Sequence, residues 1–342
     1  MKDSILKWAT TVLISKGYIL QHAPEIVVNT PWSQVIRLST SRGDFYLKQT
    51  PPAISLEPKI IQLLRDQFHA SVPIMIAIND DLHCFLMEDA GQTLRAHLKT
   101  DFQPDLLLQA IDQHTTIQRS VENHIESFLA LGVPDWRLEK LPHLYDQLIQ
   151  QTELLKAEGL TDKELQILRD LTPTVSKQCE LLSQYQIPDT FVQPDFHTNN
   201  VLFDSVTQKM TFIDWGEIVI SHPFFALHNF LLQAITHHGV KEPDLIYQQL
   251  QDACLENWLA CATKNQLSEA CMLVKKLFPI YSALAYHRLM MSVDLQALKL
   301  FYAHRPNRLA EYFREYSASA SRAGCQKIIC APHIIRPQCR NC

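Results

Sequence analysis

In the first ninety residues, apolar side chains alternate with polar ones along several short segments, a pattern typical of β-strands. An amphipathic helix with Ile5, Ala9 and Leu13 on its apolar face is expected before these segments. Ser55 is expected to cap a second helix, whose apolar stripe starts at Leu56. The pattern predicts a five-stranded sheet with one helix inserted. Its strands are expected at residues 25–29, 34–40, 45–48, 74–78 and 83–87, with turn residues at 41–44.

Helical spacing of apolar residues dominates after residue 93. One strand-rich stretch, residues 191–213, interrupts it, and the chain contains no internal repeat and no low-complexity linker. The order predicts an α+β chain with a small β-rich lobe (1–91), a connector near 88–91, and a larger, mostly helical lobe (92–320). The helices are expected at residues 106–117, 121–131, 138–156 and 162–184, and from 223 to about 316.

Glycine is scarce, with 8 glycines among 342 residues. No two of them have the spacing G-x-G, which excludes the dinucleotide-binding fingerprint, the P-loop and the nucleophile elbow. Neither an H-E-x-x-H motif nor an EF-hand calcium loop is present. The candidate chemistry must therefore come from a different set of residues.

The charge balance limits the partners of the chain. Its formal net charge of −5 offers no basic excess for nucleic acid. No apolar run is long enough to span a membrane. The short apolar stretch at residues 8–14 fits the first helix better than a signal peptide. Nine cysteines without a secretion signal predict reduced thiols in a cytoplasmic protein.

The β insert carries the strongest chemical signal. Two apolar runs flank a short polar turn at residues 204–208, which predicts a β-hairpin. Because a hairpin brings its two ends together, Asn200 and Asp214 are expected to lie side by side. A carboxylate and an amide oxygen at one point suit Mg²⁺ that carries phosphate. Asp195, on the same loop as Asn200, is placed to accept or orient the proton of an attacking hydroxyl.

This stretch resembles the catalytic segment of the aminoglycoside phosphotransferase and choline kinase family, whose fold is similar to that of the protein kinases. The family pattern HGDxHxxN, followed by a strand pair and IDW, is matched here by Asp195, His197, Asn200 and residues 213–215. The resemblance runs in order from about residue 25 to 235. Further similar stretches are residues 131–135, residues 221–224, and residues 31–33 before a strand pair whose return strand carries a lysine.

The resemblance implies a two-lobed, protein-kinase-like fold with a catalytic hairpin at residues 191–216. Lys48 would form ion pairs with the α and β phosphates of the nucleotide and with Glu57. Asn200 and Asp214 would hold Mg²⁺, and Asp195 would be the catalytic base. Further nucleotide contacts would come from the Ser33 hydroxyl and from backbone groups of a hinge at Leu86, Met87 and Glu88.

The activity that the resemblance implies is ATP-dependent transfer of the γ-phosphate to a hydroxyl of a small molecule in a cleft between the lobes. GTP is the less favoured donor. Aminoglycosides, choline and other amino alcohols, sugars and nucleosides all stay open as acceptors. The sequence also leaves open the oligomeric state and the role of residues 240–320.

Two departures from the family pattern motivate an alternative. Gln193-Pro194 stands where the family has HG, and the phosphate-covering loop, residues 29–34, has no glycine. The alternative is a nucleotide-binding regulator that has lost catalysis, against which the retained Asp195, Asn200 and Asp214 argue. A protein kinase is disfavoured, because neither a Gly-rich loop nor an A-P-E segment is present.

Each candidate residue also has a purely structural interpretation. Aspartate and asparagine favour turns and caps, a strand-edge lysine is commonly exposed, and a glutamate at a helix start complements the helix dipole. The ordered set around one hairpin favours the functional interpretation. His197 is expected to support its loop by a hydrogen bond rather than to act as an acid or base. The structural interpretations concern Asp195, Asn200, Asp214, Lys48 and Glu57.

The C-terminal segment, residues 321–342, carries four basic and no acidic side chains and is expected to be a flexible, cysteine-containing tail. Cys339 and Cys342 have the spacing of zinc ligands. The gap between Cys325 and Cys330 is one residue longer than usual, so a zinc site is the disfavoured alternative.

Overall fold

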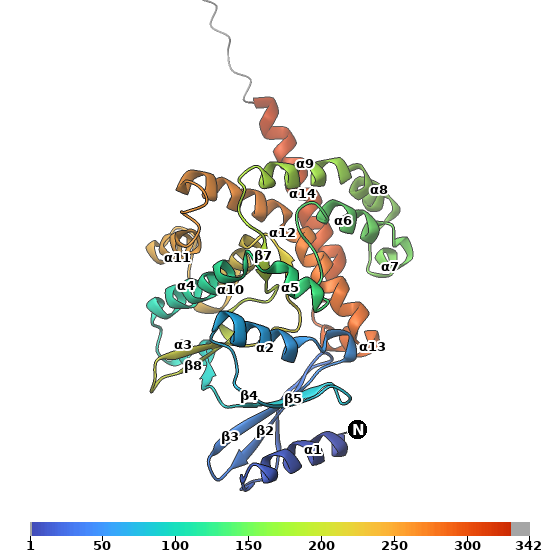
Figure 1. Ribbon diagram of the computed structural model, residues 1–342. Helices are drawn as coiled ribbons and strands as arrows, with labels where there is room; N and C mark the ends of the chain where they lie inside the picture. The colour runs from blue at the N-terminus through green and yellow to red at the C-terminus, as the bar shows by residue number, and fades with distance from the viewer. Residues whose placement is uncertain (1, 330–342) are drawn as a thin grey trace, which may run out of the picture.

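The computed structural model describes residues 2–329, which form a β-rich part and a larger helical part (Figure 1). The β-rich part is a five-stranded antiparallel sheet with the strand order β1-β2-β3-β5-β4. The predicted five-stranded sheet is therefore confirmed. Its strands are β1 (Glu25–Asn29), β2 (Gln34–Thr40), β3 (Gly43–Gln49), β4 (Met75–Asn79) and β5 (Cys84–Glu88).

Two helices cover opposite faces of this sheet (Figure 1). On α1 (Lys2–Ser15), residues spaced by one helical turn, such as Ile5 and Ala9, pack with Leu47 and Leu86 into one core cluster. Phe85 belongs to the other core cluster, together with α2 (Glu57–Phe68). Lys48 follows Leu47 in β3 and is the cross-strand partner of Phe85. Since side chains alternate along a strand, Lys48 points to the opposite face from Leu47, which is the face covered by α2. That face is turned toward the helical part.

The start of α2 differs from the prediction. A 3₁₀ turn (Pro52–Ile54) leads into the helix, and the N-cap residue is Leu56, which makes no side-chain cap bond. The Ser55 hydroxyl instead donates to the Pro52 carbonyl at 2.8 Å. The expected Ser55 cap is wrong because the Ser55 backbone (φ −83°, ψ 11°) is not extended, as that of a capping residue is, and the helix begins after Leu56.

The helical part contains more and shorter helices than the apolar spacing predicts. The helix expected at 162–184 is two helices, because Pro173 lacks the N–H that would continue the first one and starts a new helix instead. The helix expected at 138–156 is also divided, at Gln151, whose ψ of 61° leaves the helical region. The helices up to this point are α3 (Leu94–Thr100), α4 (Pro104–Val121), α5 (Ile125–Ala130), α6 (Leu141–Ile149), α7 (Thr152–Ala157), α8 (Asp162–Asp170) and α9 (Thr172–Ser183).

The predicted hairpin in the helical part is confirmed. It is formed by β8 (Val201–Asp204) and β9 (Lys209–Phe212), which pair in register from Val201 opposite Phe212. A short strand, β6 (Gln92–Thr93), joins its edge. Two further strands flank the hairpin in the sequence, β7 before it and β10 after it, and they pair with each other. These strands are β7 (Thr190–Val192) and β10 (Val219–Ser221), and a 3₁₀ turn, Thr198–Asn200, lies just before β8.

The last helices run from the hairpin region to the end of the described chain. The boundary expected at residue 320 falls within α14, and residues 330–342 lie outside the described residues. The zinc alternative stays untested, because Cys330, Cys339 and Cys342 lie outside the described residues. The helices are α10 (Phe224–His238), α11 (Leu245–Glu256), α12 (Lys264–Ser292), α13 (Leu295–Phe301) and α14 (Arg308–Ile329).

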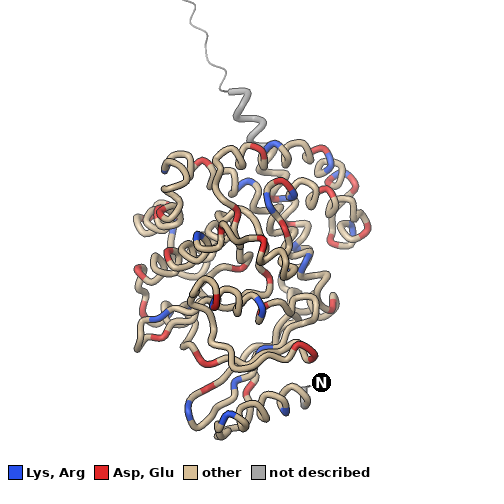
Figure 2. The backbone as a smooth tube through the Cα atoms, viewed as in Figure 1, with Lys and Arg blue, Asp and Glu red and all other residues tan. Residues whose placement is uncertain are grey.

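Charged residues are distributed over both parts, with acidic and basic positions interspersed along the helices (Figure 2). Across the described residues, no helix combines the length and the apolar character that crossing a membrane requires.

We expect Gly91→Ala to destabilise the junction between the two parts. Gly91 has φ +100°, and a Cβ there would lie 2.4 Å from the backbone oxygen of Phe203 in β8. The left-handed backbone and the close approach together predict a loss of roughly 3 kcal/mol in the free energy of unfolding. Gly17→Ala is the matched control, since Gly17 has φ +81° and open space around it. Urea denaturation measures both losses. Equal losses would contradict the importance of the contact with β8.

Candidate active site

The loop that carries Asp195 is fixed by its neighbour in sequence. Phe196 is fully buried and stacks on His114, with 3.7 Å between ring centroids, and on Phe230, with 4.7 Å. The Asn229 side chain also donates a hydrogen bond to the Phe196 carbonyl at 3.1 Å. The Asp195 side chain itself is 59% exposed. A rigid, buried anchor therefore presents a solvent-accessible carboxylate.

Asp195 is surrounded by groups that favour its charged form. Removal from water raises its pKa, but the hydrogen bond and charge of His197, the charge of Arg95 and the Asn200 amide outweigh this and hold the pKa below its usual value. His197 Nε2 lies 3.2 Å from Asp195 Oδ1, and Asn200 Nδ2 donates to the Asp195 carbonyl at 2.9 Å. Asp195 is thus an ionised, oriented carboxylate, and His197 supports it as predicted.

The two ends of the hairpin meet as expected. The Ile213 N–H donates to the Asn200 carbonyl at 3.0 Å, which places Asp214 next to Asn200. Asp214 has φ 68°, a left-handed conformation that aspartate tolerates better than most residues. Gln193, one of the departures from the family pattern, is buried and donates to the carbonyls of Ile213 at 2.7 Å and Asp214 at 2.9 Å. Gln193 therefore links the Asp195 loop to the Asp214 loop.

Lys48 joins the β-rich part to this loop. Its Nζ lies 2.7 Å from Glu57 Oε2 and 2.7 Å from Asp214 Oδ1, so the expected Lys48–Glu57 ion pair is present. Burial lowers the pKa of Lys48, but the carboxylates of Asp214 and Glu57 outweigh it and raise the pKa above its usual value. Burial raises the pKa of Glu57, and Lys48 partly offsets this. Glu57 Oε1 also accepts a hydrogen bond from the Trp215 N–H at 3.2 Å.

The remaining predicted nucleotide contacts lie on two elements of the sheet. Ser33 is in the β1–β2 turn, where its N–H donates to the Thr30 hydroxyl at 3.0 Å. The Leu86 side chain is buried beneath α1, on the face away from Lys48. Met87 packs against the core cluster on the face of Lys48, and Glu88 is half-buried at the end of β5. The Leu86 side chain therefore faces away from the site, and its backbone lies between β3 and β4 in the sheet.

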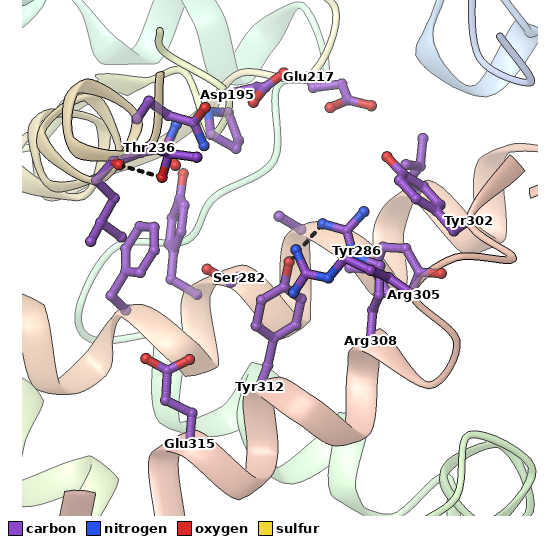
Figure 3. A pocket seen from close by; sticks show the side chains of 18 of the residues that line it. Asp195, Glu217, Thr236, Ser282, Tyr286, Tyr302, Arg305, Arg308, Tyr312 and Glu315 are labelled. Atoms are coloured by element: carbon purple, nitrogen blue, oxygen red, sulfur yellow. Dashed lines mark hydrogen bonds between the residues drawn. The ribbon is translucent and has the colours of Figure 1, made fainter. Parts of the chain in front are cut away.

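A cavity of about 460 Å³ opens beside Asp195 and Asp214. Figure 3 shows Asp195 and Glu217 at one side and Arg308 and Tyr312 on α14 at the other. Trp32 of the β1–β2 turn also lines the cavity, and its ring stacks on Tyr302 with 5.8 Å between centroids. Sequence reasoning missed Glu217 and the α14 residues, although Glu217 follows the predicted metal ligand by three positions, and it noted Trp32 only as part of the similar stretch at residues 31–33. Other lining residues include Phe278, Tyr281, Ser282, Tyr286 and Glu315.

The loop after Asp214 is held from the opposite side by Arg288 of α12. Its guanidinium donates to the carbonyls of Glu217 at 2.9 Å and Ile218 at 3.2 Å. Nothing in the sequence pattern of α12 indicated this contact, which joins residues about seventy positions apart.

We expect Glu217→Gln to remove a pH-dependent loss of stability in the free protein. The pKa of Glu217 is raised to about 7, first by burial and then by the charges of Asp214 and Asp195, while Arg288 and Lys48 oppose the shift. Between about pH 4.5 and 7 the folded state keeps a proton that the unfolded state releases, so stability falls as the pH rises through this window. The variant should gain on the order of 3 kcal/mol over the wild type at pH 8.

At pH 5 this gain should be much smaller, because the Glu217 carboxyl is then neutral in the folded protein. Urea unfolding at the two pH values, without nucleotide or Mg²⁺, measures the difference. A gain that is the same at both values would contradict a raised pKa at Glu217.

The chain has detectable relatives by family pattern and by structure. A model of the phosphotransferase enzyme family matches residues 27–262, more than half of the chain. No curated protein matches in sequence. Macrolide 2′-phosphotransferase type I is similar in structure, with a TM-score of 0.55, 11% identity, and coverage of 91% of this chain and 96% of that one.

Two further solved structures give the same result. Aminoglycoside 2′-phosphotransferase IIIa, in a complex with GDP, has a TM-score of 0.58 and 15% identity over 94% of this chain and 99% of that one. The ethanolamine kinase of Plasmodium vivax has a TM-score of 0.55 and 11% identity over 93% and 89%. At these identities the likeness concerns the fold, and the predicted two-lobed, kinase-like α+β fold is confirmed.

Proposed function

Because the chain belongs to the phosphotransferase enzyme family, we propose that it transfers the γ-phosphate of ATP to a hydroxyl group of a small molecule held in the 460 Å³ cavity. The observation that carries this proposal is the position of Asp195. Its ionised carboxylate lines the cavity together with Asp214, which is bonded to the buried Lys48.

In the proposed reaction the acceptor oxygen attacks the γ-phosphorus, the bond from this phosphorus to the oxygen of ADP breaks, and Asp195 takes the hydroxyl proton. His197 orients the carboxylate by its 3.2 Å contact. Little covalent chemistry is required of the protein, since phosphoryl transfer depends mainly on positioning and on neutralising charge. Lys48 supplies positive charge to the α and β phosphates. The Ser33 hydroxyl and the backbone of Leu86, Met87 and Glu88 complete the proposed nucleotide contacts.

Asn200 and Asp214 fit the requirements of Mg²⁺. Asp214 uses Oδ1 for Lys48 and is 37% exposed, and Asn200 uses its Nδ2 for the Asp195 carbonyl, which turns its amide oxygen the other way. Two oxygen donors suit a magnesium ion that completes its shell with water and phosphate oxygens. When bound, the ion would neutralise phosphate charge. No cluster of three or more histidine, cysteine or acidic ligands occurs among the described residues.

The test is transfer of label from [γ-³²P]ATP to small molecules, with aminoglycosides, amino alcohols, sugars and nucleosides as acceptors. [γ-³²P]GTP is tested in parallel, since one structural neighbour is recorded with GDP. A labelled small molecule in the presence of Mg²⁺ supports the proposal. Nucleotide binding without transfer to any acceptor would favour the inactive regulator instead.

A further inference from the structure

The wall of the cavity opposite Asp195 carries an arginine within a group of tyrosines. The guanidinium carbon of Arg308 lies 4.2 Å from the ring centroid of Tyr302 and 5.1 Å from that of Tyr286. Its Nη2 donates to the Tyr312 hydroxyl at 3.0 Å. All four residues line the cavity (Figure 3). These contacts fix the position of the guanidinium, because a cation is attracted to the face of an aromatic ring.

This arginine has no acidic partner. No carboxylate of the described part of the chain forms an ion pair with Arg308, and its buried Nε has no hydrogen-bond partner there either. Nearby arginines differ, since Arg305 pairs with Glu311 at 2.9 Å and Arg314 with Glu164 at 2.7 Å. A half-buried charge is costly unless it is paired. The neutral tyrosines replace only part of the hydration that the Arg308 guanidinium loses on burial. A negatively charged ligand beside it would supply the missing partner.

We infer that the acceptor carries an anionic group, a carboxylate or a phosphate, which Arg308 binds while the acceptor hydroxyl lies at Asp195. The inference rests on the proposed function and names its substrate class. The guanidinium bonds only to the neutral hydroxyls of Tyr312 and Tyr302, and its Nε has no hydrogen-bond partner in the described residues, so N–H donors remain whose fork geometry suits a carboxylate or phosphate.

The charges in the cavity favour this orientation. The carboxylates of Asp195 and Asp214 make the catalytic end negative, so an anionic group is repelled there and attracted to Arg308 on the far wall. Glu315 of α14 also lines the cavity, so the attraction comes from Arg308 itself and not from the wall as a whole. A purely cationic acceptor would meet the uncompensated charge of Arg308. A volume of about 460 Å³ suits a small molecule that spans from one end to the other.

The first arm of the experiment identifies the acceptor. The full chain is incubated with [γ-³²P]ATP, Mg²⁺ and the small-molecule fraction of a cell extract, and the labelled product is isolated intact and identified by mass spectrometry, with fragmentation to distinguish the transferred phosphate from a phosphate of the acceptor. An acceptor with a carboxylate or a phosphate supports the inference, and the spectrum shows which of the two is present. A neutral or purely cationic acceptor would overturn the inference and leave the proposed function standing. If no small molecule is labelled, the proposed function fails, and the inference with it.

The second arm uses Arg308→Gln with the acceptor so identified. We expect its KM to rise about 10- to 100-fold, as for the loss of a hydrogen bond to a charged group, with kcat and the KM for ATP changed less than about threefold. Arg308→Lys keeps the charge and should lose less. Arg314→Gln, on the same helix but outside the cavity, is the matched control. A lower melting temperature with an unchanged acceptor KM would make Arg308 a structural part of the tyrosine cluster and overturn the inference.

Discussion

Asp195→Asn should reduce kcat for phosphoryl transfer by roughly 10²- to 10⁴-fold, the usual contribution of general base catalysis. Asparagine has the same shape as aspartate and still accepts the hydrogen bond of His197, which lies 3.2 Å away in the wild type. It does not take up a proton from the attacking hydroxyl. The loss should therefore appear in the chemical step, measured as initial rates of labelled product at saturating ATP and acceptor.

Binding of nucleotide provides the control for this variant. Lys48 and Asp214 are unchanged in it, so the Kd for Mg·ATP, measured by calorimetry, should stay within about threefold of the wild type. The Phe196 anchor is also unchanged, so the melting temperature should be preserved. Turnover close to that of the wild type would remove Asp195 as the base. The proposed site would then need another proton acceptor, and Glu217 is a further carboxylate that lines the same cavity.

The sequence predicted the five-stranded sheet and the hairpin at the centre of the site because both depend on short-range patterns. Strand alternation fixes which face of β3 carries Lys48, and a hairpin between residues 201 and 213 brings Asn200 and Asp214 together whatever surrounds them. The lysine–glutamate pair, which joins one strand to the next helix, was implied by the resemblance to the family. The other two predictions needed only the local period of the chain.

The residues that sequence reasoning missed act over long distances. Arg288 holds the Glu217 loop from α12, and Arg308 reaches the cavity from α14, both within a region whose apolar spacing indicates helices and nothing more. Helical periodicity shows which side of a helix is apolar, but it does not show which polar residue faces a cavity. Gln193 is one of the two departures from the family pattern that motivate the regulator alternative, and its amide joins the Asp195 loop to the Asp214 loop.

Lys48→Met should cost about 3–5 kcal/mol of unfolding free energy, the largest loss of stability that we expect from a single substitution at this site. Glu57 is 3% exposed, and its carboxylate would remain buried without its partner at 2.7 Å. Attraction between the two charges now offsets the cost of burying them. Removing one charge leaves that cost for the other. Lys264→Met, which breaks an exposed ion pair with Asp252, is the control and should cost less than about 1 kcal/mol.

The double variant Lys48→Met with Glu57→Gln separates lost charge balance from lost packing. It should recover part of the stability, since no buried charge then remains without a partner. In the single variant Glu57 loses the lysine that opposes the raising of its pKa, so the carboxyl stays protonated in the folded state to a higher pH. The stability of the Lys48→Met variant should therefore fall as the pH rises above about 4.5. Its loss of stability relative to the wild type should be smaller at pH 5 than at pH 8. Urea unfolding of the three proteins at both pH values tests this. A double variant no more stable than Lys48→Met would assign the loss to packing rather than to the uncompensated charge of Glu57.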